Sequence, residues 1–212
     1  MTLAIIFLIQ GLAYAQHTRY GMRNGHRVGG VKLTAKEEAL AAKYTTCYNS
    51  HKYNADQRRA FFPFNQSANI KLISFSSPSD VNEASDDNPY VYTAIASGNY
   101  KLNYKRVKES VELSPAAIDS LTDILYNVGY TPVKISFYLS DPGTPCYDPH
   151  NAILFIDAKG TVTQYMEFCF KCSRYYLSSS KIKNTIYCDQ KYEMLRAFFV
   201  NHGVRYSTQK EN

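Results

Sequence analysis

The sequence lacks the short motifs that mark several common enzyme and nucleotide-binding folds. No G-x-S-x-G, H-E-x-x-H, P-loop or G-x-G-x-x-G pattern occurs in its 212 residues, which argues against the hydrolases, zinc proteases and nucleotide-binding domains that those patterns mark. No internal repeat is found. Beyond the first 16 residues there is no apolar run of the about 20 residues that span a bilayer, so no transmembrane segment is expected in the mature chain.

Tryptophan is absent, whereas tyrosine occurs 19 times. Tyrosine has a large apolar face and a polar tip, so it can line a sheet face that is partly wet. Tyrosine-rich surfaces also bind ligands, but within strands the simpler interpretation is cross-strand packing. With 45% hydrophobic and 20% charged residues, the chain has the balance of an ordinary globular protein.

The first 15 residues predict a secretory signal peptide. An apolar run from Leu3 to Leu12 precedes the small-x-small site Ala13-Tyr14-Ala15, which is typical of cleavage after Ala15. The run is too short to span a bilayer, and no cysteine follows the site, which argues against a lipoprotein anchor. We therefore expect a secreted or periplasmic protein.

Positive charge is concentrated early in the mature chain. The formal net charge is +6, and residues 16–60 hold nine Lys or Arg against three acidic residues. This basic segment could contact anionic lipid head groups or polyanionic glycans, although a solvated basic face is the simpler interpretation. Nucleic acid is not expected as a partner of an exported protein, and no specific partner is indicated.

The sequence predicts three helices. The capping box from Thr34 to Glu37 begins one over residues 35–46. Ser114 as N-cap and Pro115 at N1 begin the second, with Gly129 as its C′ residue. Asp189 is expected to cap the third, which ends at Asn201-His202-Gly203.

Strands are predicted between these helices. Residues 97–99 and 157–160 read as hairpin turns, the second with Gly160 at the position that favours positive φ. Residues 175–185 are polar and have no strand pattern. The expected strands cover residues 70–75, 90–96, 100–107, 133–139, 152–156 and 161–170.

This order predicts an α+β fold, with a small antiparallel sheet, helices packed on one face and a cysteine cluster at one end of a hairpin. The expected organisation is a signal peptide (1–15), a flexible basic N-terminus (16–33), a helix plus β-rich segment (34–112) and an α-β-ββ-α cysteine module (113–208). The last two segments could form one domain.

Three of the five cysteines lie near the predicted 152–170 hairpin. Cys146 and His150 precede its first strand, and Cys169 and Cys172 end its second, so the hairpin should bring them together. Such a Cys₃His set suits a zinc-type site. Export favours disulfides instead, with Cys146 bonded to one cysteine of the C-x-x-C pair and Cys188 or Cys47 bonded to the other.

Catalysis at this cluster has weaker support from the sequence. Thioredoxin-like folds place a reactive C-x-x-C after the first strand at a helix N-terminus, whereas Cys169-Phe-Lys-Cys172 ends a late strand. A Cys–His nucleophile needs a third group that orients the base, and catalytic groups usually come from separate elements. A thiol–disulfide or metal-dependent enzyme therefore remains an alternative.

The back half of the chain carries a set of motifs around its cysteines. They are Cys146, Tyr147, Pro149, the 151–157 hairpin strand, Tyr165, Glu167, Cys169, Phe170, Cys172, and the tail Cys188 to Phe199 with Gly203 to Tyr206. With these motifs, residues 113–208 resemble a family of exported bacterial proteins with no assigned activity. The resemblance implies that Cys146, Cys169, Cys172 and Cys188 act as one cluster, with His150 a less certain ligand.

The leading interpretation is an exported, soluble, non-catalytic protein of unknown role. In it the C-terminal module is held together by Cys146, Cys169, Cys172 and Cys188, either as disulfides or as a structural zinc-type site, with His150 as a further metal-ligand candidate. The alternatives are an enzyme that acts at the same cluster and a surface-binding protein that uses the basic N-terminal segment.

Overall fold

The computed structural model describes most of the chain after the basic N-terminus. The predicted signal peptide lies outside the described residues, and so does most of the 16–33 segment, apart from Leu33 and the short antiparallel pair of β1 (Arg27–Val28) and β2 (Val31–Lys32). None of the helices in the described part is long and apolar enough to cross a membrane. The described residues are 27–28, 31–80, 90–95, 98–137, 139, 146–183, 185 and 187–208.

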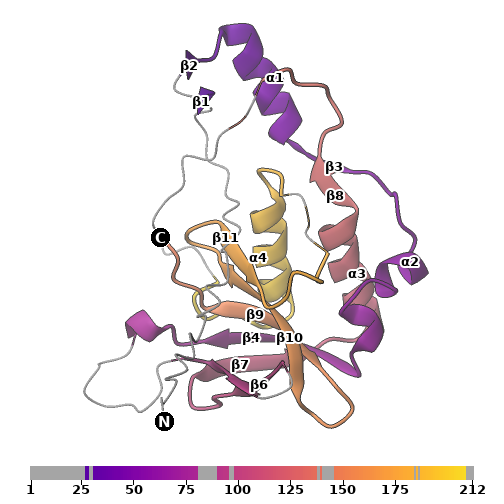
Figure 1. The fold of residues 1–212 in the computed structure, drawn as a ribbon, viewed down its shortest axis with the longest axis vertical. Coiled ribbons are helices and arrows are strands. Elements are labelled where there is room, and N and C mark those ends of the chain that lie inside the picture. The colour runs from indigo at the N-terminus through magenta and orange to yellow at the C-terminus, as the bar shows by residue number, and fades with distance from the viewer. Residues whose placement is uncertain are drawn as a thin grey trace, which may run out of the picture.

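A seven-stranded antiparallel sheet forms the centre of the fold (Figure 1), so the predicted α+β class is confirmed, although the sheet is larger than expected. Its order is β5-β6-β10-β9-β4-β7, and β11 pairs with the same edge of β10 as β6. Strands β9 and β10 of the 113–208 segment lie between the pairs β5–β6 and β4–β7 of the 34–112 segment. The strands are β4 (Asn69–Phe75), β5 (Tyr92–Ile95), β6 (Asn99–Leu102), β7 (Val107–Glu112), β9 (Asn151–Ile156), β10 (Val162–Cys169) and β11 (Arg174–Leu177).

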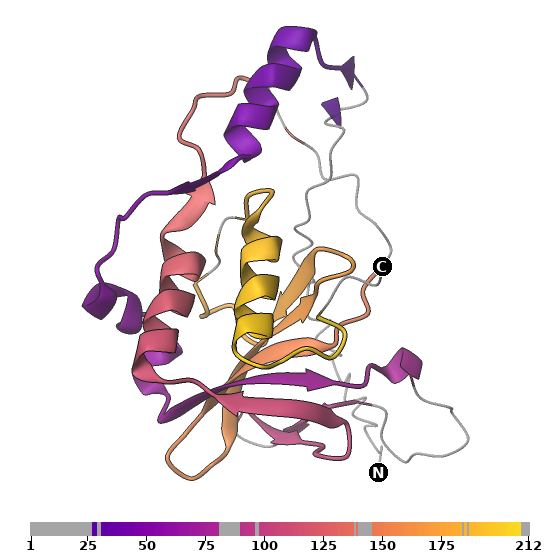
Figure 2. The ribbon, with the colours of Figure 1, turned by 180° about the vertical axis from the view of Figure 1, so that it is seen from behind.

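Two helices, α3 (Pro115–Tyr126) and α4 (Lys191–Asn201), lie side by side on one face of the sheet, as predicted (Figure 2). Ser114 caps α3 by accepting a hydrogen bond from the amide of Ala117 at 3.2 Å. Apolar side chains of both helices pack on alternate residues of the strands to form the main core, which includes Leu72, Leu121, Leu125, Ile153, Phe155, Met166, Phe168, Leu195 and Phe199.

The hairpin of β9 and β10 forms where the sequence predicted it. The Asp157 carboxylate accepts hydrogen bonds from the amides of Lys159 and Thr161 at 2.9 and 2.8 Å. Gly160 has a φ of 81°, a conformation that costs little only for glycine. Gly98 has a similar φ of 74° just before β6. Local turn chemistry therefore sets both hairpins.

Several predicted features differ in the structure, including the 100–107 strand, which is divided between β6 and β7. No strand occurs in the described part of 133–139, and Gly129 lies inside β8 (Val128–Tyr130) rather than at a helix C′ position. The missing strand has no partner, since β8 pairs with β3 (Cys47–Asn49) immediately before it. Strand β11 was not predicted, because its pairing with β10 outweighs the polar composition around it.

The final helix begins at the N-cap Gln190, so the prediction that Asp189 caps it is wrong. Instead, Asp189 accepts a hydrogen bond from the Thr45 hydroxyl at 2.7 Å. Thr45 is the last residue of α1 (Ala35–Thr45), whose capping box at Thr34 is present as predicted. This bond links two segments that are 144 residues apart.

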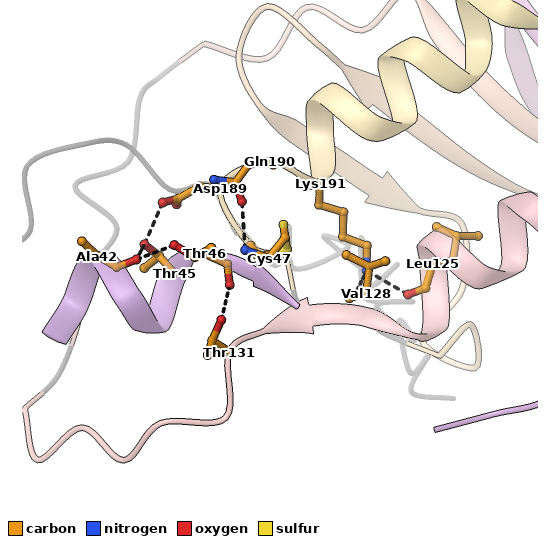
Figure 3. The surroundings of a disulfide bond; sticks show 11 residues. Ala42, Thr45, Thr46, Cys47, Leu125, Val128, Thr131, Asp189, Gln190 and Lys191 are labelled. Carbon is orange, nitrogen blue, oxygen red and sulfur yellow. Dashed lines mark hydrogen bonds between the residues drawn. A yellow bond between two sulfur atoms is a disulfide. The ribbon is translucent and has the colours of Figure 1, made fainter. Parts of the chain in front are cut away.

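Helix α1 lies beyond the β3–β8 pair, at the opposite end of the molecule from the sheet (Figure 1). A disulfide between Cys47 and Cys188 fastens this end to the start of α4 (Figure 3). The Cys47 amide also donates to the Gln190 side chain at 2.8 Å. Little of α1 is buried, so these contacts and the stacking of Tyr44 on Tyr130, with ring centroids 4.6 Å apart, attach its C-terminal end to the rest of the chain.

Lys191 lies next to this disulfide and is fully buried (Figure 3). Its ammonium donates to the carbonyl oxygens of Leu125 and Val128 at 2.8 and 2.7 Å, which satisfies acceptors at the C-terminal end of α3. Burial lowers the pKa of Lys191 to about 7. The residue thus joins the first turn of α4 to the last turn of α3.

A second buried cation lies in α2 (Ala55–Arg59). Arg58 donates to a carboxylate oxygen of Asp119 at 2.6 Å and to the Tyr53 carbonyl at 2.8 Å. It also lies 3.4 Å from the carboxylate of Asp123 on α3. This part of the basic segment is therefore structural and does not belong to a solvated basic face.

Removing the Cys47–Cys188 disulfide is expected to destabilise the protein. The bond closes a loop of 141 residues, so Cys47→Ser with Cys188→Ser should lower the free energy of unfolding by about 2–5 kcal/mol. Guanidinium unfolding followed by circular dichroism measures this. The matched pair Cys146→Ser with Cys172→Ser opens a 26-residue loop and should cost about 1–2 kcal/mol less. An unchanged transition in the first variant would contradict the role of the bond.

Candidate functional site

A cavity of about 750 Å³ opens on the face of the sheet that α3 and α4 leave uncovered. Strand alternation explains its position. On β10, Met166 and Phe168 point into the helix-covered core, whereas Tyr165 and Glu167 line the cavity. Strands β5, β6 and β11 supply further walls, and the segments 77–79 and 147–149 close one side.

Tyrosine rings make up much of the cavity wall. Tyr92 and Tyr165 stack with their ring centroids 4.0 Å apart, and Tyr100 meets Tyr165 edge to face at 4.9 Å. The Tyr100 hydroxyl donates to the Ser178 carbonyl at 3.2 Å, which fixes the orientation of that ring. Cross-strand packing was predicted for tyrosine, and these pairs confirm it. The tyrosines that line the cavity are Tyr90, Tyr92, Tyr100, Tyr147, Tyr165 and Tyr176.

Glu167 places a carboxyl group among these rings. It accepts a hydrogen bond from the Tyr147 hydroxyl at 2.7 Å. Burial raises the pKa of Glu167 to about 7, because the charged form has lost most of its hydration and the Tyr147 bond offsets only part of that cost. At neutral pH the carboxyl group is therefore close to its titration midpoint.

A second acid, Asp148, lines the same cavity beside a serine pair. Its carboxylate accepts hydrogen bonds from the hydroxyl of Ser77 and, at 2.7 Å, from that of Ser79. Burial alone would raise the pKa of Asp148, but these two hydrogen bonds and His150 lower it below its ordinary value. Asp148 is thus held as a carboxylate at one rim of the cavity.

The cysteines lie next to the cavity. Cys146 and Cys172 form a disulfide, and Cys169, the last residue of β10, is a buried free thiol. The Cys169 sulfur accepts a hydrogen bond from the Cys172 amide at 3.3 Å. Burial raises the pKa of the Cys169 thiol, which keeps it protonated and poorly nucleophilic.

The structure brings together only some of the predicted metal-ligand residues. The sulfurs of Cys146, Cys169 and Cys172 lie within 4.8 Å of one another. Cys188 is bonded to Cys47 instead, so the four cysteines implied by the family resemblance do not form one cluster. His150 also lies apart, with Nε2 2.9 Å from the Asp80 carboxylate and Nδ1 3.0 Å from the Asp148 carbonyl.

While Cys146 and Cys172 are joined by a disulfide, the three-sulfur group does not fit a zinc ion. Zinc binds deprotonated thiolates, and two of the three sulfurs are bonded to each other. Reduction of the Cys146–Cys172 bond would free three thiols at metal-ligand distances. A metal site is therefore available only to the reduced chain.

Sequence reasoning missed the cavity and Glu167 as a functional group. One signal was present, because Tyr165, Glu167 and Cys169 alternate along a predicted strand and must share one face. That pattern places a carboxyl group between a tyrosine and a cysteine. It does not indicate that β5 and the 146–149 segment enclose the group.

Comparison with protein-family models, with curated proteins and with solved structures finds no match to this chain.

The disulfide assignment predicts a specific thiol count. Unreduced protein that is unfolded in guanidinium and treated with iodoacetamide should gain one alkyl group, at Cys169. Native protein treated in the same way without denaturant should gain almost none, because that thiol is buried. After reduction all five cysteines should react. Intact mass spectrometry measures each state. Three reactive thiols in the unreduced chain would show that one of the two disulfides is absent.

The raised pKa of the Glu167 carboxyl group predicts a pH-dependent stability. Its folded-state pKa of about 7 exceeds the value near 4.3 of an unfolded chain, so the folded form binds the extra proton between those values. The wild type should therefore lose stability relative to Glu167→Gln as pH rises from about 4.5 to 7, by up to about 3 kcal/mol.

Urea unfolding at several pH values measures this difference. Glu112→Gln, at an exposed glutamate on β7 that pairs with Lys71, is the matched control. Parallel pH profiles for the wild type and Glu167→Gln would contradict the buried position of the carboxyl group.

Proposed function

We propose that this chain is an exported, disulfide-stabilised binding protein without catalytic activity of its own, and that the cavity holds a small organic ligand. The observation that carries the proposal is the cavity of about 750 Å³ with its tyrosine lining. Ligand sites are typically concave, of about 300–1,000 Å³, and largely apolar with a few polar groups that fix orientation. The cavity has each of these properties.

The state of the cysteines favours binding over catalysis. A nucleophilic Cys146 would need a free thiolate and a nearby base, but its sulfur is bonded to Cys172 and His150 contacts Asp80. Cys169 is free, yet it is buried and its pKa is raised. Neither cysteine has the exposed, activated thiolate that thiol enzymes use.

Export is supported by the two disulfides, which persist in oxidising compartments such as the periplasm or the extracellular space. The signal-peptide pattern and the resemblance to exported bacterial proteins agree with it and remain predictions. Contact of the basic segment with anionic surfaces also remains a prediction.

A second candidate function is metal or thiol chemistry at the reduced cysteine group. One observation favours it, namely that the sulfurs of Cys146, Cys169 and Cys172 lie within 4.8 Å of one another. This function requires a reductant that opens the Cys146–Cys172 bond, so it suits a protein that meets reducing conditions. Zinc is then the metal that three thiolate ligands would be expected to bind.

Calorimetric titration with four small probes tests the binding proposal. The probes are choline, phenol, benzoate and glucose, which represent cationic, aromatic, anionic and sugar ligands. At least one should bind, and Ala94→Trp, which adds bulk to a small residue of the cavity wall, should weaken that binding at least tenfold.

The control is Thr93→Trp, whose side chain points to the opposite face of β5 and should leave binding unchanged. If none of the probes bound at millimolar concentration, or if Ala94→Trp had no effect on binding, the proposed function would be wrong.

A further inference from the structure

The geometry points to an organic ammonium cation as the chemical group that the tyrosine-lined cavity recognises. This inference rests on the proposed binding function and adds the class of ligand. It is carried by three features of the described residues, namely the charge of the lining, the incomplete hydrogen bonding of Glu167 and the arrangement of the rings.

The charge of the cavity opposes that of the whole chain. The formal net charge is +6, yet the described residues that line the cavity include two acids, Asp148 and Glu167, and no Lys, Arg or His. A concave site lined by one sign of charge concentrates ligands of the other sign. The lining therefore attracts cations and disfavours carboxylates and phosphates.

Glu167 is incompletely partnered. Within the described part of the chain, the Tyr147 hydroxyl is its one hydrogen-bond donor, and no cationic side chain forms an ion pair with it. An ionised carboxylate can accept several hydrogen bonds, and a charge that has lost part of its hydration is costly unless it is paired. A ligand cation beside Glu167 would supply the missing partner.

The rings around Glu167 suit a cation with apolar substituents. Alkylated ammonium groups bind against tyrosine faces through cation–π attraction, and clusters of such rings form the aromatic cages that select them. Phe75, Tyr92, Tyr165 and Tyr100 form a continuous series of ring contacts along the wall, with centroid distances of 5.8, 4.0 and 4.9 Å. This series is already packed, so binding requires little ordering of side chains.

The volume of the cavity sets a minimum size for a ligand that fills it. A volume of about 750 Å³ exceeds that of a trimethylammonium group, so a ligand that fills it also carries an apolar or aromatic body. The stacked pair of Tyr92 and Tyr165 offers a surface for such a body. The expected ligand is thus an amphiphilic or aromatic amine rather than a simple inorganic cation.

The test compares choline with 3,3-dimethylbutan-1-ol, which has the same shape but a carbon in place of the charged nitrogen. Calorimetric titration of the intact, oxidised protein at pH 8 should give choline an affinity at least tenfold higher than the neutral isostere. Glu167→Gln should remove most of that preference while it leaves the weak binding of the isostere unchanged. Glu112→Gln on the outer strand β7 is the matched control and should retain the preference.

Each result bears on the inference. If the isostere binds as well as choline, or if phenol, benzoate or glucose binds the cavity and choline does not, the cation inference is wrong while the binding function stands. If Glu167→Gln keeps the full preference for choline, the recognition does not involve this carboxylate and the inference is also wrong. If no probe binds, the proposed function and the inference fail together.

Discussion

The structure depends on the two-residue alternation of β10, the strand that pairs with β9 along one edge and with β6 and β11 along the other. Met166 and Phe168 must enter the core beneath α3 and α4. Their neighbours Tyr165 and Glu167 are then held on the opposite face. A one-residue change of register would exchange these sets and bury a carboxyl group in the main core. The packing that stabilises the sheet therefore also positions the cavity.

Two buried cations and the half-buried Glu167 show how differently the protein treats charged groups. Arg58 is paired with Asp119, and the Lys191 ammonium is held by two backbone carbonyl oxygens. Both join structural elements. Glu167 has a single tyrosine hydroxyl as its donor within the described residues. This contrast is the physical reason to regard Arg58 and Lys191 as structural and Glu167 as part of a site.

The sequence predicted the features that local chemistry determines. The capping box at Thr34, the Ser114-Pro115 helix start and the turn at Gly160 each involve a few adjacent residues. Features that depend on distant partners were missed. Strand β11 exists because Tyr176 pairs with Glu167, and Gly129 lies in a strand because it pairs with Tyr48. Disulfide pairing and the surroundings of Glu167 likewise arise only when segments 20 or more residues apart meet.

The most direct test of the account is the NMR spectrum of the protein with ¹³C-labelled tyrosine rings during titration with choline. The account predicts shifts that saturate at the cavity tyrosines Tyr92, Tyr100 and Tyr165, with no change at Tyr187 and Tyr192, which belong to the helix-covered core. Shifts confined to tyrosines outside the cavity, or no shift at millimolar choline, would contradict the assignment of this cavity as a site for an organic cation.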